Sequence, residues 1–138
     1  MENNLFVHLY QNNPTVGLTD GVIVSENDSE TSPIIIGVNA TNSEISQGKK
    51  IGIRSESTYQ TSAEVPTIIS LVGASSSNWA LSLDNVVWQP YGSPISIATQ
   101  ITPVNTIFYC RGRANLIELP ENDRSVNISI LSQIESTL

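Results

Sequence analysis

The residues best suited to nucleophilic catalysis are His8 and Cys110, the only histidine and the only cysteine in the chain. Such catalysis needs a nucleophile, a base and an orienting group that converge. His8 belongs to an alternating strand pattern and Cys110 occupies a position typical of the core, so we expect an edge imidazole and a buried, inert thiol. The sequence also lacks a Gly-x-Ser-x-Gly elbow, a His-Glu-x-x-His motif, a Cys-x-x-Cys pair and a phosphate-binding glycine loop. We therefore expect no enzymatic activity, no catalytic residues and no cofactor.

Three acidic residues, Glu26, Asp28 and Glu30, alternate along the chain and could offer hard oxygen ligands to calcium. Their spacing lacks the glycine and the terminal bidentate glutamate of an EF-hand loop. The pattern favours a solvated acidic loop, and we predict no metal site.

Aromatic residues cluster at Trp79, Trp88 and Tyr91, within thirteen positions. Trp79 is in phase with Leu81 and Leu83, which places it in the expected core. Trp88 and Tyr91 could either pack against the sheet or form a binding surface, since exposed aromatic rings stack on sugars and anchor protein interfaces. Both alternatives stay open at this point.

Arginine residues occur at alternate positions nearby, at Arg111 and Arg113, on the same expected strand face as Tyr109. Their guanidinium groups could pair with carboxylates of a partner. Alternatively, their stems cover a sheet face while their charged ends remain in water.

The elements that must position these residues are strands. Isoleucine and valine number 17 and 11, against 10 leucines and 6 alanines, and β-branched residues favour strands. Short apolar runs alternate with turn residues every eight to twelve or so positions, as in a sandwich or barrel. Asp84 and Asn85 suit a two-residue hairpin turn. We expect strands near residues 5–10, 22–25, 34–36, 51–54, 67–72, 79–83, 86–88, 95–101, 106–114 and 126–130.

The C-terminal segment is ambiguous, because Val126, Ile130, Ile134 and Leu138 are four residues apart and could form a helical stripe. The β-branched and polar residues between them favour a strand instead. Residues 132–138 are expected to form a short arm, either frayed or docked on a neighbour. We predict a single domain over residues 1–138.

Charge excludes one class of partner. Six basic and thirteen acidic residues give a net charge of -7 and a pI near 4.4, so nucleic acid would be repelled. No apolar run approaches the roughly 18 residues of a membrane span, and no basic leader precedes the first strand, so we expect no membrane association.

Two segments carry a resemblance to a known family. Residues 78–97 read NWALSLDNVVWQPYGSPISI, and residues 106–114 read TIFYCRGRA. They resemble the immunoglobulin-like domains of bacterial surface proteins and tailed-phage virion proteins, which often pair a W-x-L-S-x-D-x-x-x-W hairpin with a later strand ending in Arg-x-Arg-Ala. Residues 122–128, NDRSVNI, are similar to the final turn and strand of those domains. The resemblance implies an all-β, immunoglobulin-like sandwich of about 7–9 antiparallel strands, without the disulfide of antibody domains.

The resemblance also implies a role in the virion, made in the host cytoplasm. The whole profile is similar to capsid decoration (cement) proteins of tailed phages, which bind the major capsid protein on the outside of the shell, often as trimers. A tail or baseplate component is the first alternative. The rival from another class is a carbohydrate-binding module that uses Trp88 and Tyr91. Partner-binding residues are expected among Leu5, Phe6, Tyr10, Trp88 and Tyr91, with Arg111 and Arg113 as charge partners.

Overall fold

The computed structural model describes residues 6–24, 34, 36, 45–73, 76–113 and 126–138. These residues are nearly all β. Their strands are β1 (Val7–Gln11), β2 (Val22–Ile23), β3 (Lys49–Ser55), β4 (Tyr59–Thr61), β5 (Thr67–Val72), β6 (Trp79–Ser82), β7 (Ile95–Ile97), β8 (Thr106–Gly112), β9 (Asn127–Leu131) and β10 (Ile134–Ser136). Within the described part, the helical element is the 3-10 turn η2 (Ser76–Asn78), and no helix is long and apolar enough to cross a membrane.

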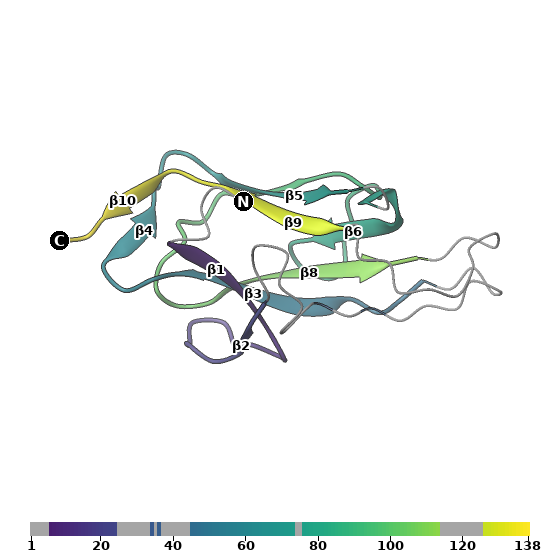
Figure 1. The fold of residues 1–138 in the computed structure, drawn as a ribbon, viewed down its shortest axis with the longest axis horizontal. Coiled ribbons are helices and arrows are strands. Elements are labelled where there is room, and N and C mark those ends of the chain that lie inside the picture. The colour runs from purple at the N-terminus through teal and green to yellow at the C-terminus, as the bar shows by residue number, and fades with distance from the viewer. Residues whose placement is uncertain (1–5, 25–33, 35, 37–44, 74–75, 114–125) are drawn as a thin grey trace.

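The strands form two facing layers (Figure 1). One layer is a five-stranded antiparallel sheet in the order β2-β1-β3-β8-β6, and the other is a three-stranded sheet in the order β7-β5-β9. A small sheet of β10 and β4 lies at the end of the molecule that holds the C-terminus (Figure 1). The sheets of the described residues do not close into a barrel, so the predicted all-β sandwich is confirmed, while its immunoglobulin-like subclass stays a prediction.

The core lies between the two layers and is built by alternate residues of each strand. In β8, Phe108 and Cys110 are fully buried while Arg111 is half-buried on the opposite face, as the alternation predicts. Trp79 packs against this core, as expected. Burying each large apolar side chain contributes about 1.5–3 kcal/mol before entropy is counted. The largest fully buried apolar residues include Ile51, Ile53, Ile69, Leu81, Phe108 and Ile130.

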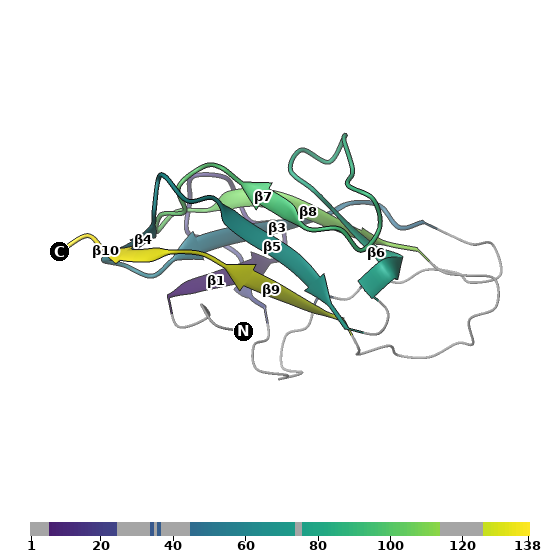
Figure 2. The same cartoon turned by 90° about the horizontal axis from the view of Figure 1, so that it is seen from above.

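The chain reversal after β6 differs from the predicted two-residue turn. Ser82 and Trp88 form an isolated antiparallel bridge, so five residues make the reversal. Asp84 Oδ1 accepts hydrogen bonds from the backbone N–H groups of Val86 and Val87, both at 2.9 Å. This side-chain turn competes with a tight hairpin and widens it. The loop projects beyond the sheets (Figure 2).

Because of the wider turn, the predicted burial of Leu83 is wrong. The sequence places Leu83 on the core face with Trp79 and Leu81, but its side chain is 50% exposed. β6 ends at Ser82, so the alternation that would turn Leu83 inward ends there. Leu83 instead belongs to the exposed loop.

The C-terminal segment forms strands, not a helix, which confirms the preferred alternative. Residues of β10 pair with β4, and Thr137 N donates to Thr58 O at 2.9 Å. The arm therefore docks on its own chain. The sequence pattern missed β4, because its three residues are polar or aromatic and lack an apolar alternation.

Other predicted strands are shorter than expected. Of the described residues 22–24, Val22 and Ile23 form a strand, and of residues 95–101 only Ile95–Ile97 do, while Ser25 lies outside the described residues. Ile34 and Ile36 pack against the core without strand pairing, while Ile35 lies outside the described residues.

Candidate functional site

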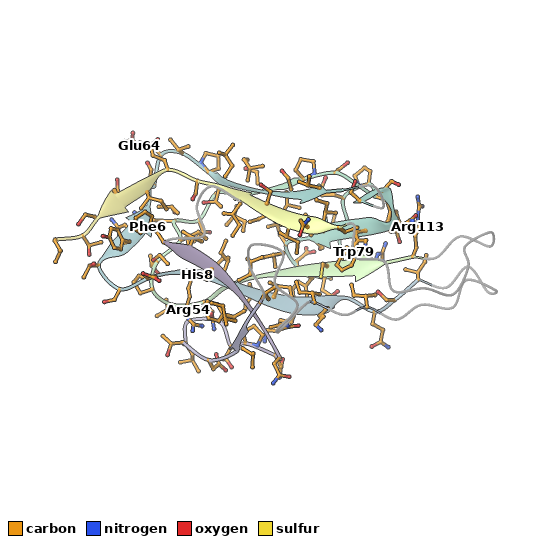
Figure 3. The ribbon with its side chains drawn as sticks, in the orientation of Figure 1. Phe6, His8, Arg54, Glu64, Trp79 and Arg113 are labelled. Carbon is orange, nitrogen blue, oxygen red and sulfur yellow. The ribbon has the colours of Figure 1, made fainter. Side chains whose placement is uncertain are left out.

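The candidate site starts from the outer face of β8. Alternation in β8 turns Arg111 away from the core, and the register pairs it with Ala80 of β6. Arg113 follows two residues later, its backbone N–H bonded to Asn78 O at 2.9 Å. Its Nη2 donates to Ser77 O at 3.3 Å. Figure 3 shows Arg113 near one end of the sheets, beyond β8.

The loop after β6 brings two aromatic rings onto this face. Gln89 N donates to Leu81 O at 3.0 Å, and Gly92 N donates to Trp79 O at 2.8 Å, so the loop returns alongside β6. Ala80 points outward yet is 0% exposed. The returning segment therefore covers this face, and its aromatic residues Trp88 and Tyr91 contact the arginines.

These four residues form a stacked group, which we name the arginine-aromatic cluster: Trp88, Tyr91, Arg111 and Arg113. The Arg111 guanidinium carbon lies 4.3 Å from the Trp88 ring centroid and 5.8 Å from that of Tyr91. The Arg113 guanidinium carbon lies 4.0 Å from the Tyr91 centroid. Each close cation-π contact of this kind contributes about 0.5–1 kcal/mol at an exposed site. The cluster is thus ordered before any partner arrives.

A missing side chain makes room for the cluster. A Cβ atom added to Gly48 would overlap the Asn85 carboxamide and would lie 3.0 Å from Trp88 Cζ2. Gly48 immediately precedes β3, so the loop after β6 lies over the start of that strand. The sequence placed Asn85 in a turn but gave no sign of its approach to Gly48, although the glycine before an alternating strand was a visible signal.

The loop that carries Trp88 is itself held by Asp84. The backbone N–H groups of Val87 and Val86, and then the Ser82 hydroxyl, hold the pKa of Asp84 below its ordinary value of 3.8. Ser82 Oγ also donates to Val87 O at 2.6 Å and accepts from Asn85 N at 3.0 Å. Asn85 adopts a left-handed backbone, with φ at 63°. These contacts fix the backbone of the residues that precede Trp88.

Several donors of the cluster lack acceptors. Among the described residues, the buried Tyr91 Oη, Arg111 Nε and Arg113 Nε have no hydrogen-bond partner. Unsatisfied buried polar atoms are uncommon in native proteins and call for an explanation. The ring contacts compensate part of that loss for the two guanidinium groups.

The other expected anchors lie elsewhere. The rings of Phe6 and Tyr59 are 4.5 Å apart between centroids, tilted by 44°, and Figure 3 places Phe6 toward the end of the molecule opposite Arg113. Tyr10 stacks under Arg54, whose guanidinium carbon is 3.5 Å from the ring centroid. The structure therefore brings together Trp88, Tyr91, Arg111 and Arg113 but joins neither Phe6 nor Tyr10 to them. Leu5 lies outside the described residues.

The pair considered for catalysis does not converge. His8 projects from the outer face of β1, where its Nε2 lies 3.0 Å from Glu56 Oε1. Cys110 is buried on the inner face of β8, and burial raises the pKa of its thiol to about 12. A thiol with that pKa is not a nucleophile at neutral pH.

The described residues form no metal centre. In the described ranges, no group of three or more His, Cys, Asp and Glu side chains could hold an ion. Glu26, Asp28 and Glu30 lie outside those ranges.

The chain matches no protein-family model, no curated protein and no solved structure. No function is therefore transferred from another protein, and the functional evidence is the arrangement of the described side chains.

Proposed function

We propose that this chain is a non-enzymatic structural protein that docks on another protein through the arginine-aromatic cluster. Tryptophan, tyrosine and arginine are the residues that carry most binding energy at protein interfaces, and here they gather on one outer face. The observation that carries the proposal is this convergence of Trp88, Tyr91, Arg111 and Arg113 from a loop and a strand.

The cluster is also suited to docking because it is ordered in advance. The guanidinium groups already stack on the rings, and the loop before Trp88 is bonded to Asp84. Ordering flexible side chains costs about 0.5–1.5 kcal/mol for each residue at an interface, and a preformed cluster avoids part of that cost.

We further propose the virion as its place of action, as a capsid decoration protein that binds the outside of the shell. The segments that resemble tailed-phage immunoglobulin-like domains, residues 78–97 and 106–114, are those that supply the cluster. A small contact can suffice there, because many copies bound at neighbouring positions act at high effective concentration. A homo-oligomer, such as a trimer, would strengthen attachment in the same way.

The test is addition of purified protein to preformed shells and, separately, to tails of the virus that encodes it. We expect co-sedimentation with shells and a raised temperature of shell disruption. The Arg111→Gln, Arg113→Gln double variant should lose co-sedimentation, while Lys49→Gln should retain it.

Lys49 is a matched control because its register partner is Cys110, which places it on the inner side of the same sheet. Binding to tails alone would instead indicate a tail or baseplate component. Failure to bind either particle would end the virion proposal.

One observation favours a second candidate function, the recognition of a surface glycan. An open concavity of about 600 Å³ is lined largely by amide and lysine side chains, and the Trp88 ring lies against its Gly48 border. Amides can both donate to and accept from sugar hydroxyls. The described lining residues are Gln11, Asn12, Asn13, Val22, Gly48, Lys49 and Lys50.

The ring contacts weigh against that function. Arg111 occupies one face of Trp88 and Arg113 one face of Tyr91, which leaves at most the opposite face of each ring for sugar stacking. A Trp88→Ala variant that loses retention on a glycan array but still binds particles would favour the glycan.

A further inference from the structure

Positive charge is concentrated on one face of this acidic protein. Of the six basic residues, Lys49, Lys50 and Arg54 lie on β3, Arg111 lies on β8, and Arg113 directly follows β8. By register and alternation, all of these except Lys49 project from the outer face of the five-stranded sheet. Four basic residues therefore lie on the outer face of this sheet, although the chain carries a net charge of -7.

Within the described part of the chain, Lys50, Arg111 and Arg113 form no ion pair with a carboxylate, whereas Arg54 interacts electrostatically with Asp20. The ion pair found there joins His8 to Glu56 and involves neither a lysine nor an arginine. Arg54 is held instead by Asp20 O at 2.8 Å and Asn105 Oδ1 at 2.9 Å.

Arg111 lies at the centre of the arginine-aromatic cluster. It makes ring contacts with Trp88 and Tyr91, and no hydrogen bond from it to a described residue is present. Of its guanidinium nitrogens, Nε is buried without a hydrogen-bond partner, whereas the two Nη groups are not both buried and unpartnered. A guanidinium presents paired donors in a fixed fork, which matches the two oxygens of a carboxylate. Stacking on Trp88 holds that fork in place.

An apolar tip lies directly beside this group. Leu83, Val86 and Val87 are 50%, 78% and 65% exposed on the loop that ends at Trp88. The Asp84 hydrogen bonds order this loop, so the exposure of its apolar side chains is maintained. Aliphatic side chains held in water next to an interface cluster are typical of a protein-binding surface.

We infer that the partner is an acidic protein surface that presents carboxylates to Arg111 and Arg113 and an apolar recess to the tip formed by Leu83, Val86 and Val87. The inference rests on the proposed docking function and names the chemistry of its partner. An acidic partner is attracted by the basic residues on the outer face of the five-stranded sheet, which favours docking through that face. The apolar tip separates this partner from a nucleic acid or another simple polyanion, which offers no matching recess.

A pair of peptides tests the inference without knowledge of the natural partner. The probe is a fluorescent peptide of alternating glutamate and leucine, and its control has glutamine in place of each glutamate. We expect Arg111→Gln to weaken binding of the glutamate peptide by about tenfold, because charge-assisted hydrogen bonds to the peptide are lost. The double variant Arg111→Gln, Arg113→Gln should weaken binding further. Lys49→Gln should bind as the parent does, and added salt should weaken binding of the parent.

Nuclear magnetic resonance locates the contact. The Nε–H resonances of Arg111 and Arg113 should shift with the glutamate peptide, and a ¹H–¹⁵N spectrum of each variant reports that its fold is intact. The conservative Arg111→Lys variant should bind between Arg111→Gln and the parent, because it retains charge but not the planar fork.

Equal binding of the glutamine peptide would overturn the inference, and so would equal weakening by Lys49→Gln. Equally tight binding of duplex DNA or heparin would also overturn it, since that would indicate general polyanion binding. If the peptide fails but particles still bind through Arg111, the acidic partner is wrong and the proposed docking function stands. If particles bind the arginine double variant normally, the proposed docking site itself is wrong.

Discussion

Replacing Gly48 with alanine tests whether the loop after β6 truly rests on the start of β3. The added Cβ would overlap the Asn85 carboxamide and lie 3.0 Å from Trp88 Cζ2. The Asn85 carboxamide can rotate, but the Trp88 ring is held against Arg111 at 4.3 Å and must shift. We expect a loss of about 1 kcal/mol, at the low end of overpacking costs because one obstacle is flexible.

Urea denaturation measures that loss, and thermal unfolding should show a fall of about 3 °C. In a Trp79→Phe background, the fluorescence of Trp88 reports the ring directly, and its emission should shift when Gly48→Ala displaces it. Gly48→Ala should also weaken binding of the glutamate peptide, but by less than Arg111→Gln does, since Arg111 loses its stacking partner.

A double-mutant cycle isolates the contact. Asn85→Gly removes the overlapping side chain and keeps the left-handed backbone accessible. In that background the cost of Gly48→Ala should fall to about 0.5 kcal/mol. Equal costs in the two backgrounds, together with unchanged Trp88 emission, would refute the packing of this loop on β3.

Three further predictions concern the core and the loop. Phe108→Ala should destabilise the fold by about 3–5 kcal/mol in urea denaturation, because the ring is fully buried between the layers. The Val87 and Val86 N–H groups hold the folded-state pKa of Asp84 below 3.8. The stability that ionised Asp84 gives the loop is therefore present above pH 3.8 and is lost as the pH falls through the folded-state pKa. Tryptophan fluorescence should therefore report loosening of the loop below about pH 4, and Asp84→Asn should remove that transition. The buried Cys110 thiol, with its pKa raised to about 12, should resist a thiol reagent at neutral pH until urea unfolds the chain; rapid labelling of the native protein would contradict its burial.

Strand residues were the most predictable part of the fold. The alternation in residues 106–112 correctly placed Phe108 and Cys110 inward and Arg111 outward, and β5 has the expected bounds of Thr67–Val72. Side chains in a strand alternate between its two faces, so a strand buried on one face has apolar residues at alternate positions of the sequence. That local rule needs no knowledge of the partner strand.

The loop after β6 was less predictable, because its shape depends on competing hydrogen bonds. Asp84 and Asn85 suit a two-residue turn, but the Asp84 carboxylate accepts from two backbone N–H groups and widens the reversal. Leu83 consequently lies in solvent. β4 also escaped prediction, since Tyr59 and its neighbours become a strand only by pairing with residues about 75 positions later.

By itself the sequence determined an all-β chain, the inward and outward faces of its main strands, and the residue types available for binding. Tertiary structure decided which of those residues meet. Trp88 and Arg111 are 23 positions apart, and their stacking requires both the returning loop and the absence of a side chain at Gly48. Periodicity along a strand is a local property of the backbone, whereas a cluster depends on register, loop path and the space left by distant residues.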